Sequence, residues 1–134
     1  MKAIVNIIIV LVLMSGCNND CCTVLPPLEV RLWEMKGNWE VDFVSNKGVD
    51  VTSEWTGFTL TFTENKVFIT KNSADLDVWP QTGTFEFAGE TQPLLNVIIR
   101  SDGHQVNIDY INNERLDLSC DIGVKDQWVF KLKK

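Results

Sequence analysis

Residues 58–63 have the sequence FTLTFT, in which phenylalanine or leucine alternates with threonine at every second position. Successive side chains of a β-strand point to opposite faces, so this alternation predicts a strand with one apolar and one polar face. The same period of two recurs from residue 39 to the end of the chain. The predicted strands are 39–43, 58–62, 67–70, 84–87, 94–99, 106–110, 116–120 and 128–132. The strand at 94–99 is more uniformly apolar, as a strand covered on both faces would be.

Short segments with turn-forming residues separate these strands. Asparagine, aspartate and glycine occur at 46–48, 102–103 and 112–113. Segments this short join antiparallel neighbours in chain order. An up-and-down sheet of eight strands removes its exposed edges by closing on itself. We therefore predict an all-β fold, an eight-stranded antiparallel up-and-down barrel, and a two-sheet sandwich that fits the same periodicity stays the alternative.

A short helix is predicted before the first strand. Leu28, Leu32 and Met35 recur at the i, i+4 and i+7 spacing of one helix face. The prolines at 26–27 stand where the first turn of a helix tolerates them. Gly37 is expected to end the helix.

The N-terminus has the pattern of an export signal. Lys2 precedes an almost unbroken apolar run over residues 3–14. This run is shorter than the roughly 20 residues of a transmembrane helix but fits the roughly 7–15 of a secretory signal. Residues 14–17, MSGC, then resemble the lipobox of bacterial lipoproteins, in which small residues precede a cysteine that is acylated. The resemblance implies a signal peptide over residues 1–16 and lipidation of Cys17; an ordinary signal peptide with an incidental cysteine is the alternative.

Residues 17–27 are predicted to be a lipidated tether, because they are polar, contain Cys21 and Cys22, and end in two prolines. One acyl chain gives only marginal membrane affinity, whereas the two or three chains of a lipoprotein cysteine give a stable anchor. Asn18 stands where the inner-membrane retention signal of some Gram-negative lipoproteins has aspartate. The resemblance therefore implies a lipid anchor in the outer membrane, on either its periplasmic or its surface face.

The start of the first predicted strand carries a further resemblance. Residues 37–39, GNW, resemble the G-x-W signature of lipocalins. The spacing onward through the strand at 58–62, the Trp-Pro pair at 79–80 and the GTF sequence at 83–85 is similar to short lipocalin-like domains of Gram-negative lipoproteins. The resemblance covers residues 28–134 and implies a barrel that takes up a small apolar or amphipathic ligand.

The resemblance also implies a structural role for Trp39, which in the family packs across the closed base of the barrel. The chain departs from the family in two ways. No helix is evident after the last strand, and only Lys131 and Lys133 occur where the family has an arginine that covers the tryptophan.

Aromatic residues dominate the predicted interior. An eight-stranded barrel is either filled by side chains or holds one small ligand. The predicted inward set is Trp39, Phe43, Phe58, Phe62, Phe85, Phe87, Tyr110, Trp128 and Phe130. Alternating aromatics of this kind mostly form a core. Trp55 and Trp79 fall in predicted loops, and with Tyr110 they are the candidate ligand contacts; a loop tryptophan can also fold back over the core.

Two function classes fit these observations. The first is a membrane-anchored lipocalin-like module that binds a small apolar or amphipathic ligand. The second is a non-catalytic structural or adaptor lipoprotein with a filled barrel. Such an adaptor would bind an envelope protein or a glycan through Trp55, Trp79 and neighbouring loops.

Composition and motifs argue against nucleic acid and against catalysis. The chain has 12 Lys and Arg against 18 Asp and Glu, and it lacks a basic stripe with interleaved aromatics. His104, the one histidine of the sequence, follows a predicted turn, and no nucleophile, metal or phosphate motif accompanies it. Asp75 and Asp77 lack the further oxygen ligands of a calcium loop. We expect no enzyme activity, no metal and no cofactor.

The remaining cysteines form an odd set if Cys17 is lipidated, namely Cys21, Cys22 and Cys120. In an oxidising compartment one disulfide from the tether to Cys120 is one interpretation. The other is that Cys120 is a buried thiol that behaves as a small apolar residue.

Overall fold

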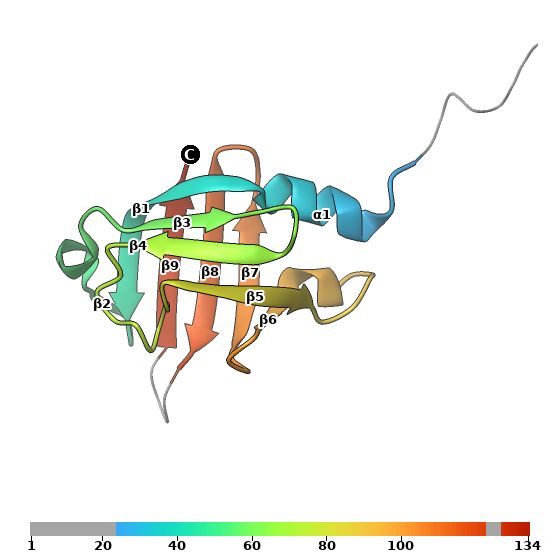
Figure 1. Ribbon diagram of the computed structural model, residues 1–134. Helices are drawn as coiled ribbons and strands as arrows, with labels where there is room; N and C mark the ends of the chain where they lie inside the picture. Colours follow the sequence, from blue (N-terminus) through green and yellow to red (C-terminus); the bar gives the residue numbers. More distant parts are fainter. Residues whose placement is uncertain (1–23, 123–126) are drawn as a thin grey trace, which may run out of the picture.

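The structure, a computed structural model, describes residues 24–122 and 127–134. The predicted signal peptide, Cys17, Cys21 and Cys22 lie outside these residues. In chain order the elements are α1 (Pro27–Met35), β1 (Gly37–Asn46), β2 (Val49–Asp50), η2 (Thr52–Trp55), β3 (Thr59–Phe62), β4 (Val67–Lys71), β5 (Thr82–Phe87), η3 (Leu94–Asn96), β6 (Val97–Arg100), β7 (Gln105–Ile111), β8 (Arg115–Asp121) and β9 (Gln127–Lys133) (Figure 1).

Eight of these strands form a closed antiparallel barrel. β1 and β3 to β9 pair with their neighbours in chain order, and β9 returns to pair with β1. β2 is a two-residue extension that pairs with the end of β1. The predicted eight-stranded antiparallel up-and-down barrel with one short N-terminal helix is therefore confirmed. The helix ends before Gly37, as predicted, and Gly37 opens β1 with a φ of +129°.

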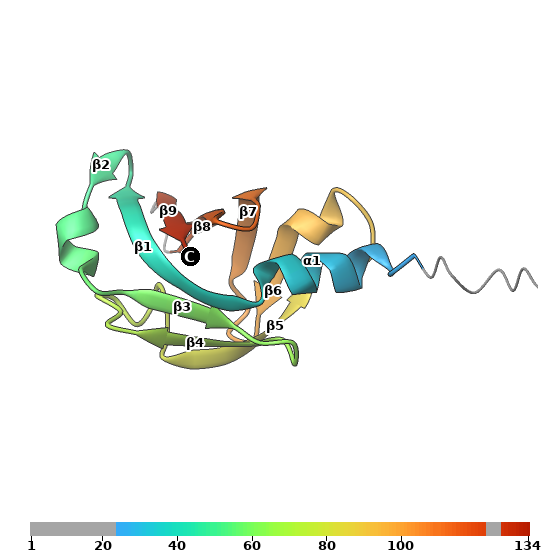
Figure 2. The same ribbon diagram turned by 90° about the horizontal axis from the view of Figure 1, so that it is seen from above.

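The barrel has two ends of different construction. At one end, here called the helix end, lie α1, η3, the start of β1 and the end of β9. At the other, here called the η2 end, lie η2, β2 and the segment 72–81 between β4 and β5. Figures 1 and 2 show α1 and η2 on opposite sides of the barrel.

A β-bulge in β1 overturns the predicted orientation of Phe43. The register of β1 against β9 shifts between Val41 and Phe43, so Val44 enters the core instead. Phe43 is half-buried on the outer face, where the ammonium of Lys131 lies 5.4 Å from its ring centre. Strict alternation from Trp39 predicts that Phe43 points inward, but the bulge interrupts the alternation before Phe43.

A second bulge, in β7, does the same to Tyr110. The register against β8 shifts between Ile108 and Tyr110, and the tyrosine is 48% exposed beneath the guanidinium of Arg115. The prediction that Tyr110 points inward is wrong. The other predicted inward aromatics are buried, namely Trp39, Phe58, Phe62, Phe85, Phe87, Trp128 and Phe130.

The predicted strand at 94–99 also needs correction. Residues 94–96 form the short helix η3, because the backbone N–H of Leu95 bonds to Thr91 and that of Asn96 to Pro93. β6 starts only at Val97, and its Ile99 is 43% exposed. The apolar run is therefore not a strand covered on both faces.

Trp39 closes the helix end. Its side chain is fully buried, and its indole N–H donates a 2.8 Å hydrogen bond to the carbonyl of Met35, the last residue of α1. The ammonium of Lys134 lies 4.5 Å from the ring centre, which suits a cation–π contact. The cation over Trp39 is thus Lys134, one residue beyond the lysines considered from the sequence.

We predict that Trp39→Ala destabilises the protein far more than Trp33→Ala. Removing a buried indole leaves a cavity and costs about 3–5 kcal/mol, whereas Trp33 is 75% exposed and its loss should cost less than about 0.5 kcal/mol. Urea unfolding of both variants measures the difference. Equal losses would contradict the assignment of Trp39 as the closure of the helix end.

Candidate functional site

Three tryptophans gather around Phe130 at the η2 end. The ring centre of Phe130 lies 4.9 Å from that of Trp55, 6.0 Å from that of Trp128 and 6.2 Å from that of Trp79. Trp55 and Trp79 are fully buried, and Trp128 is 7% exposed. They come from η2, segment 72–81 and β9, so segments distant in sequence converge on one end of the barrel.

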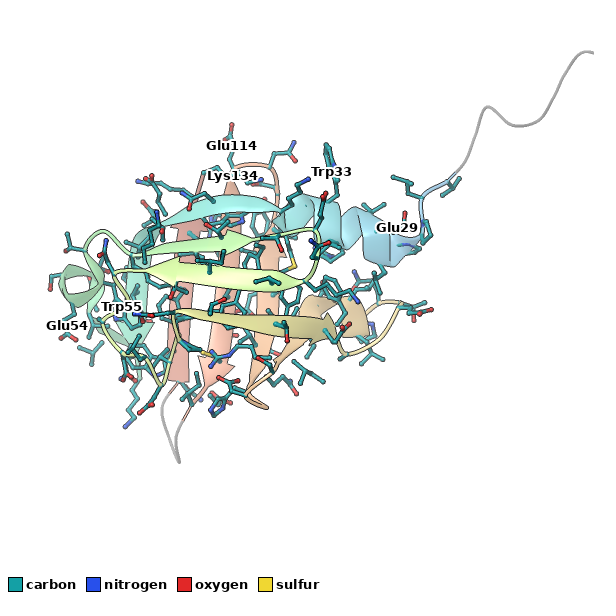
Figure 3. All side chains as sticks on the ribbon, in the orientation of Figure 1. Glu29, Trp33, Glu54, Trp55, Glu114 and Lys134 are labelled. Atoms are coloured by element: carbon teal, nitrogen blue, oxygen red, sulfur yellow. The ribbon has the colours of Figure 1, made fainter. Side chains whose placement is uncertain are left out.

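η2 is held in place by short-range hydrogen bonds. The hydroxyl of Thr52 accepts a 2.9 Å bond from the backbone N–H of Val44 in β1. The carboxylate of Asp50 accepts bonds from the hydroxyl (2.6 Å) and the backbone N–H (2.9 Å) of Thr52. These bonds fasten η2 to the end of β1, and Trp55, the last residue of η2, is fully buried (Figure 3).

Segment 72–81 folds back through a turn built on Asp75. The backbone N–H of Asp77 donates to the carboxylate of Asp75, and the backbone N–H of Trp79 donates to its carbonyl, both at 2.9 Å. The hydroxyl of Thr70 then bonds the carbonyl of Pro80 at 2.8 Å. The aspartate considered as a cation ligand thus shapes the loop that inserts Trp79.

Arg100 locks Trp79 in place and was missed from the sequence. The arginine is 2% exposed, and its guanidinium lies 5.1 Å from the Trp79 ring centre and 5.8 Å from that of Phe68. It donates to the carbonyl of Val78 and forms a salt bridge with Asp102. The available signal was an arginine at the end of an apolar strand, two residues before an aspartate in a turn.

The ion pair changes the acidity of Asp102. Partial burial of the carboxyl raises its pKa, but hydrogen bonds from the side chain of Arg100 and the backbone N–H of His104 outweigh burial, so the pKa is lowered below its ordinary 3.8. The carboxylate is thereby kept charged opposite a buried cation. An unpaired buried guanidinium would be costly.

Three buried indole N–H groups at the η2 end have no hydrogen-bond partner among the described residues. They belong to Trp55, Trp79 and Trp128, and the side-chain oxygen of Asn46, which pairs with Trp128 in the β1–β9 ladder, is also unpartnered. Buried tryptophan N–H groups usually find an acceptor, as Trp39 does at the helix end. The η2 end therefore holds three unused donors in an aromatic environment, suited to an acceptor oxygen of a small amphipathic molecule.

The structure separates the three predicted ligand contacts. Trp55 and Trp79 do lie in segments that connect strands, as predicted. Their indoles, however, are buried in the core. Of the two alternatives for loop tryptophans, folding back over the core is the one observed. Tyr110 lies near the helix-end terminus of β7, at the outer surface, and does not join them.

A groove of about 740 Å³ lies outside the barrel, along β4 and segment 72–81. Its apolar lining includes Ile69 and Leu76, which are 42% and 55% exposed. Its polar lining includes Lys71, Asn72 and Gln81. This groove is a surface on which a partner could be recognised without entering the barrel.

His104 and Cys120 are two residues for which the sequence left a chemical role to be examined. The backbone N–H of His104 donates to Asp102 at 3.1 Å. Within residues 24–122 and 127–134, no three His, Cys, Asp or Glu side chains gather as a metal site would require. Cys120 is a buried free thiol, and burial raises its pKa to about 12. Within the described residues Cys120 packs as a small apolar side chain, while Cys21 and Cys22, the partners of the alternative disulfide, lie outside them.

Comparison with protein-family models, with curated proteins and with solved structures finds no match to this chain. In the part of the chain that the structure describes, no helix has the length and apolar character needed to cross a bilayer.

We predict that Asp102→Asn lowers the free energy of unfolding at pH 7 by about 1–2 kcal/mol, a modest value because the aspartate is partly exposed. The lowered folded-state pKa means that this contribution is present above about pH 4 and is lost as pH falls below it. Urea unfolding at pH 7 and pH 2.5 measures the effect, with exposed Asp109→Asn as the matched control. A difference between Asp102→Asn and the unmodified protein that persists unchanged at pH 2.5 would refute the ion-pair account.

Proposed function

We propose that this protein is a membrane-anchored lipocalin-like lipoprotein that binds a small amphipathic ligand at the η2 end of its barrel. The three unpartnered indole N–H groups are the observation that carries the proposal. An apolar ligand body would contact the aromatic rings, and an acceptor group such as a carboxylate or carbonyl would take the N–H donors. The role requires no catalytic group.

The construction of the two ends supports the lipocalin-like interpretation. In that family a tryptophan packs across the closed base, and here Trp39 is buried against α1 with Lys134 over its ring. The ligand entrance then belongs at the opposite end, where Trp55 and Trp79 lie. Both side chains fill the barrel in this structure, so entry of a ligand requires η2 or segment 72–81 to move outward.

We predict that Trp79→Phe and Trp55→Phe each weaken ligand binding about 5–10-fold, because phenylalanine keeps an aromatic ring but removes the donor, at a cost of about 1–1.4 kcal/mol. Native mass spectrometry of the protein after incubation with an envelope lipid extract measures the bound molecule and its occupancy. Trp39→Phe is the matched control, because that indole is at the helix end. A protein that stays free of small molecules under all conditions would exclude the carrier role.

The anchor is proposed from the lipobox-like residues 14–17. We predict that the expressed full chain incorporates radiolabelled palmitate in a Gram-negative host and that Cys17→Ser abolishes the label. Cys21→Ser, four residues further on, should retain it, which separates lipobox acylation from adventitious thiol acylation. Sedimentation of the labelled protein with outer-membrane fractions tests the proposed localisation, and label retained in Cys17→Ser would contradict the anchor.

The second candidate function is an adaptor with a filled barrel, and the outer groove favours it. Arg100 fixes Trp79 inside the barrel through its own contacts, while Ile69 and Leu76 leave apolar surface beside polar groups outside. An envelope protein or a glycan would then bind in the groove. Substituting Ile69→Asp, in β4 and outside the segments that would have to move for ligand entry, would abolish such binding and leave uptake of a ligand into the barrel unchanged.

A further inference from the structure

Exposed apolar side chains lie on the outward side of α1 and in the residues just before it. Val24, Leu25, Val30 and Trp33 make up this surface, here called the α1 patch, and they are 88%, 56%, 42% and 75% exposed. Val30 and Trp33 lie three residues apart, so they share one face of the helix. Four apolar side chains at this exposure, one of them a tryptophan, indicate a contact surface.

The opposite side of α1 is fixed to the barrel. Met35 is fully buried, and Leu28 and Leu32 pack against the core from the same face. The guanidinium of Arg31 donates a 3.0 Å bond to the side chain of Asn96 in η3. The helix therefore cannot turn its apolar patch inward, and Figure 3 shows Trp33 pointing away from the barrel.

The position of the proposed lipid anchor limits how far the patch can lie from a bilayer. Six residues, 18–23, separate Cys17 from Val24. A chain spans at most about 3.6 Å per residue, so Val24 lies within about 25 Å of the acylated cysteine. A tether of at most this length keeps the α1 patch near the membrane surface, where a high effective concentration favours a weak second contact.

The charges beside the patch favour an apolar contact over an electrostatic one. Arg31 is paired with Glu34 at 3.2 Å, and Lys36 with Glu64 at 2.7 Å. Both cations are thus already neutralised by protein carboxylates. Tryptophan is enriched at the membrane–water interface, so a bilayer surface matches the chemistry of the patch.

We infer that the α1 patch inserts into the headgroup region of the membrane that carries the lipid anchor, with Trp33 as its main contact. This inference rests on the proposed acylation of Cys17. The membrane then holds the protein at two points, and the helix end of the barrel faces the bilayer. The η2 end, on the opposite side of the barrel, is left accessible from the aqueous phase (Figures 1 and 2).

Tryptophan fluorescence tests this insertion, because the lipid-accessible signal comes mainly from Trp33. Of the five tryptophans, Trp33 is exposed, and the other four are at most 7% exposed. The acylated full chain is reconstituted into phosphatidylcholine vesicles with or without brominated acyl chains, which quench only nearby indoles. The emission of Trp33 is the difference between the native chain and Trp33→Phe. Because interfacial side chains lie about 5–10 Å into the boundary, brominated lipid should lower that emission by about half or more.

Two charge substitutions locate the contact. Val30→Asp places a charge beside Trp33 on the same helix face and should remove most of the quenching. Leu76→Asp places the same charge on an exposed leucine at the η2 end and should leave the quenching unchanged. Equal quenching in these two variants would overturn the assignment of the α1 patch as the contact.

Flotation of the same vesicles separates failure of this inference from failure of the proposed anchor. Protein that floats with the vesicles but shows the same Trp33 emission in brominated and plain lipid contradicts membrane insertion of the α1 patch alone. Protein that does not float contradicts the acyl anchor and, with it, this inference. Protein that floats and is quenched through Trp33 supports both.

Discussion

The antiparallel pairing of β1 with β9 is the constraint on which the rest of the structure depends. Residues 37–40 of β1 pair with β3, whereas residues 40–46 pair with β9. The bulge between Val41 and Phe43 lies where the strand changes partners. A bulge bends a strand and increases its twist, and Figure 2 shows the resulting curve of β1. Pairing with β9 closes the sheet into a barrel and sets which side chains enter the core.

The two ends of the closed barrel differ in how their buried polar groups are satisfied. At the helix end the buried indole of Trp39 is satisfied by a carbonyl of α1 and covered by the ammonium of Lys134. At the η2 end three buried indoles lack acceptors, and a buried guanidinium is satisfied by a neighbouring loop. The η2 end therefore has more unsatisfied buried donors than the helix end. Each such donor costs free energy. In the proposed function, the ligand would supply the missing acceptors at this end.

A membrane contact through α1 would point the helix end toward the bilayer and the η2 end away from it. The α1 patch lies on the helix side, while Trp55, Trp79 and the outer groove lie on the η2 side. A barrel held by α1 would keep both candidate binding surfaces away from the lipid. This arrangement suits either proposed function, because a diffusing ligand and an envelope partner would both approach from the aqueous phase.

The sequence by itself determined the eight strands, their order and the short helix. The period of two, the turn residues and the helical spacing of Leu28, Leu32 and Met35 are local patterns that can be identified along the chain without tertiary contacts. The sequence could not locate the two bulges, because a period of two shows neither where β1 changes its partner from β3 to β9 nor where the register of β7 against β8 shifts, and so it misplaced Phe43 and Tyr110. Tertiary structure alone decided that Trp55 and Trp79 fold inward. Their burial depends on Phe130 and Arg100, which reach the η2 end from β9 and β6, and no spacing along the chain encodes that meeting.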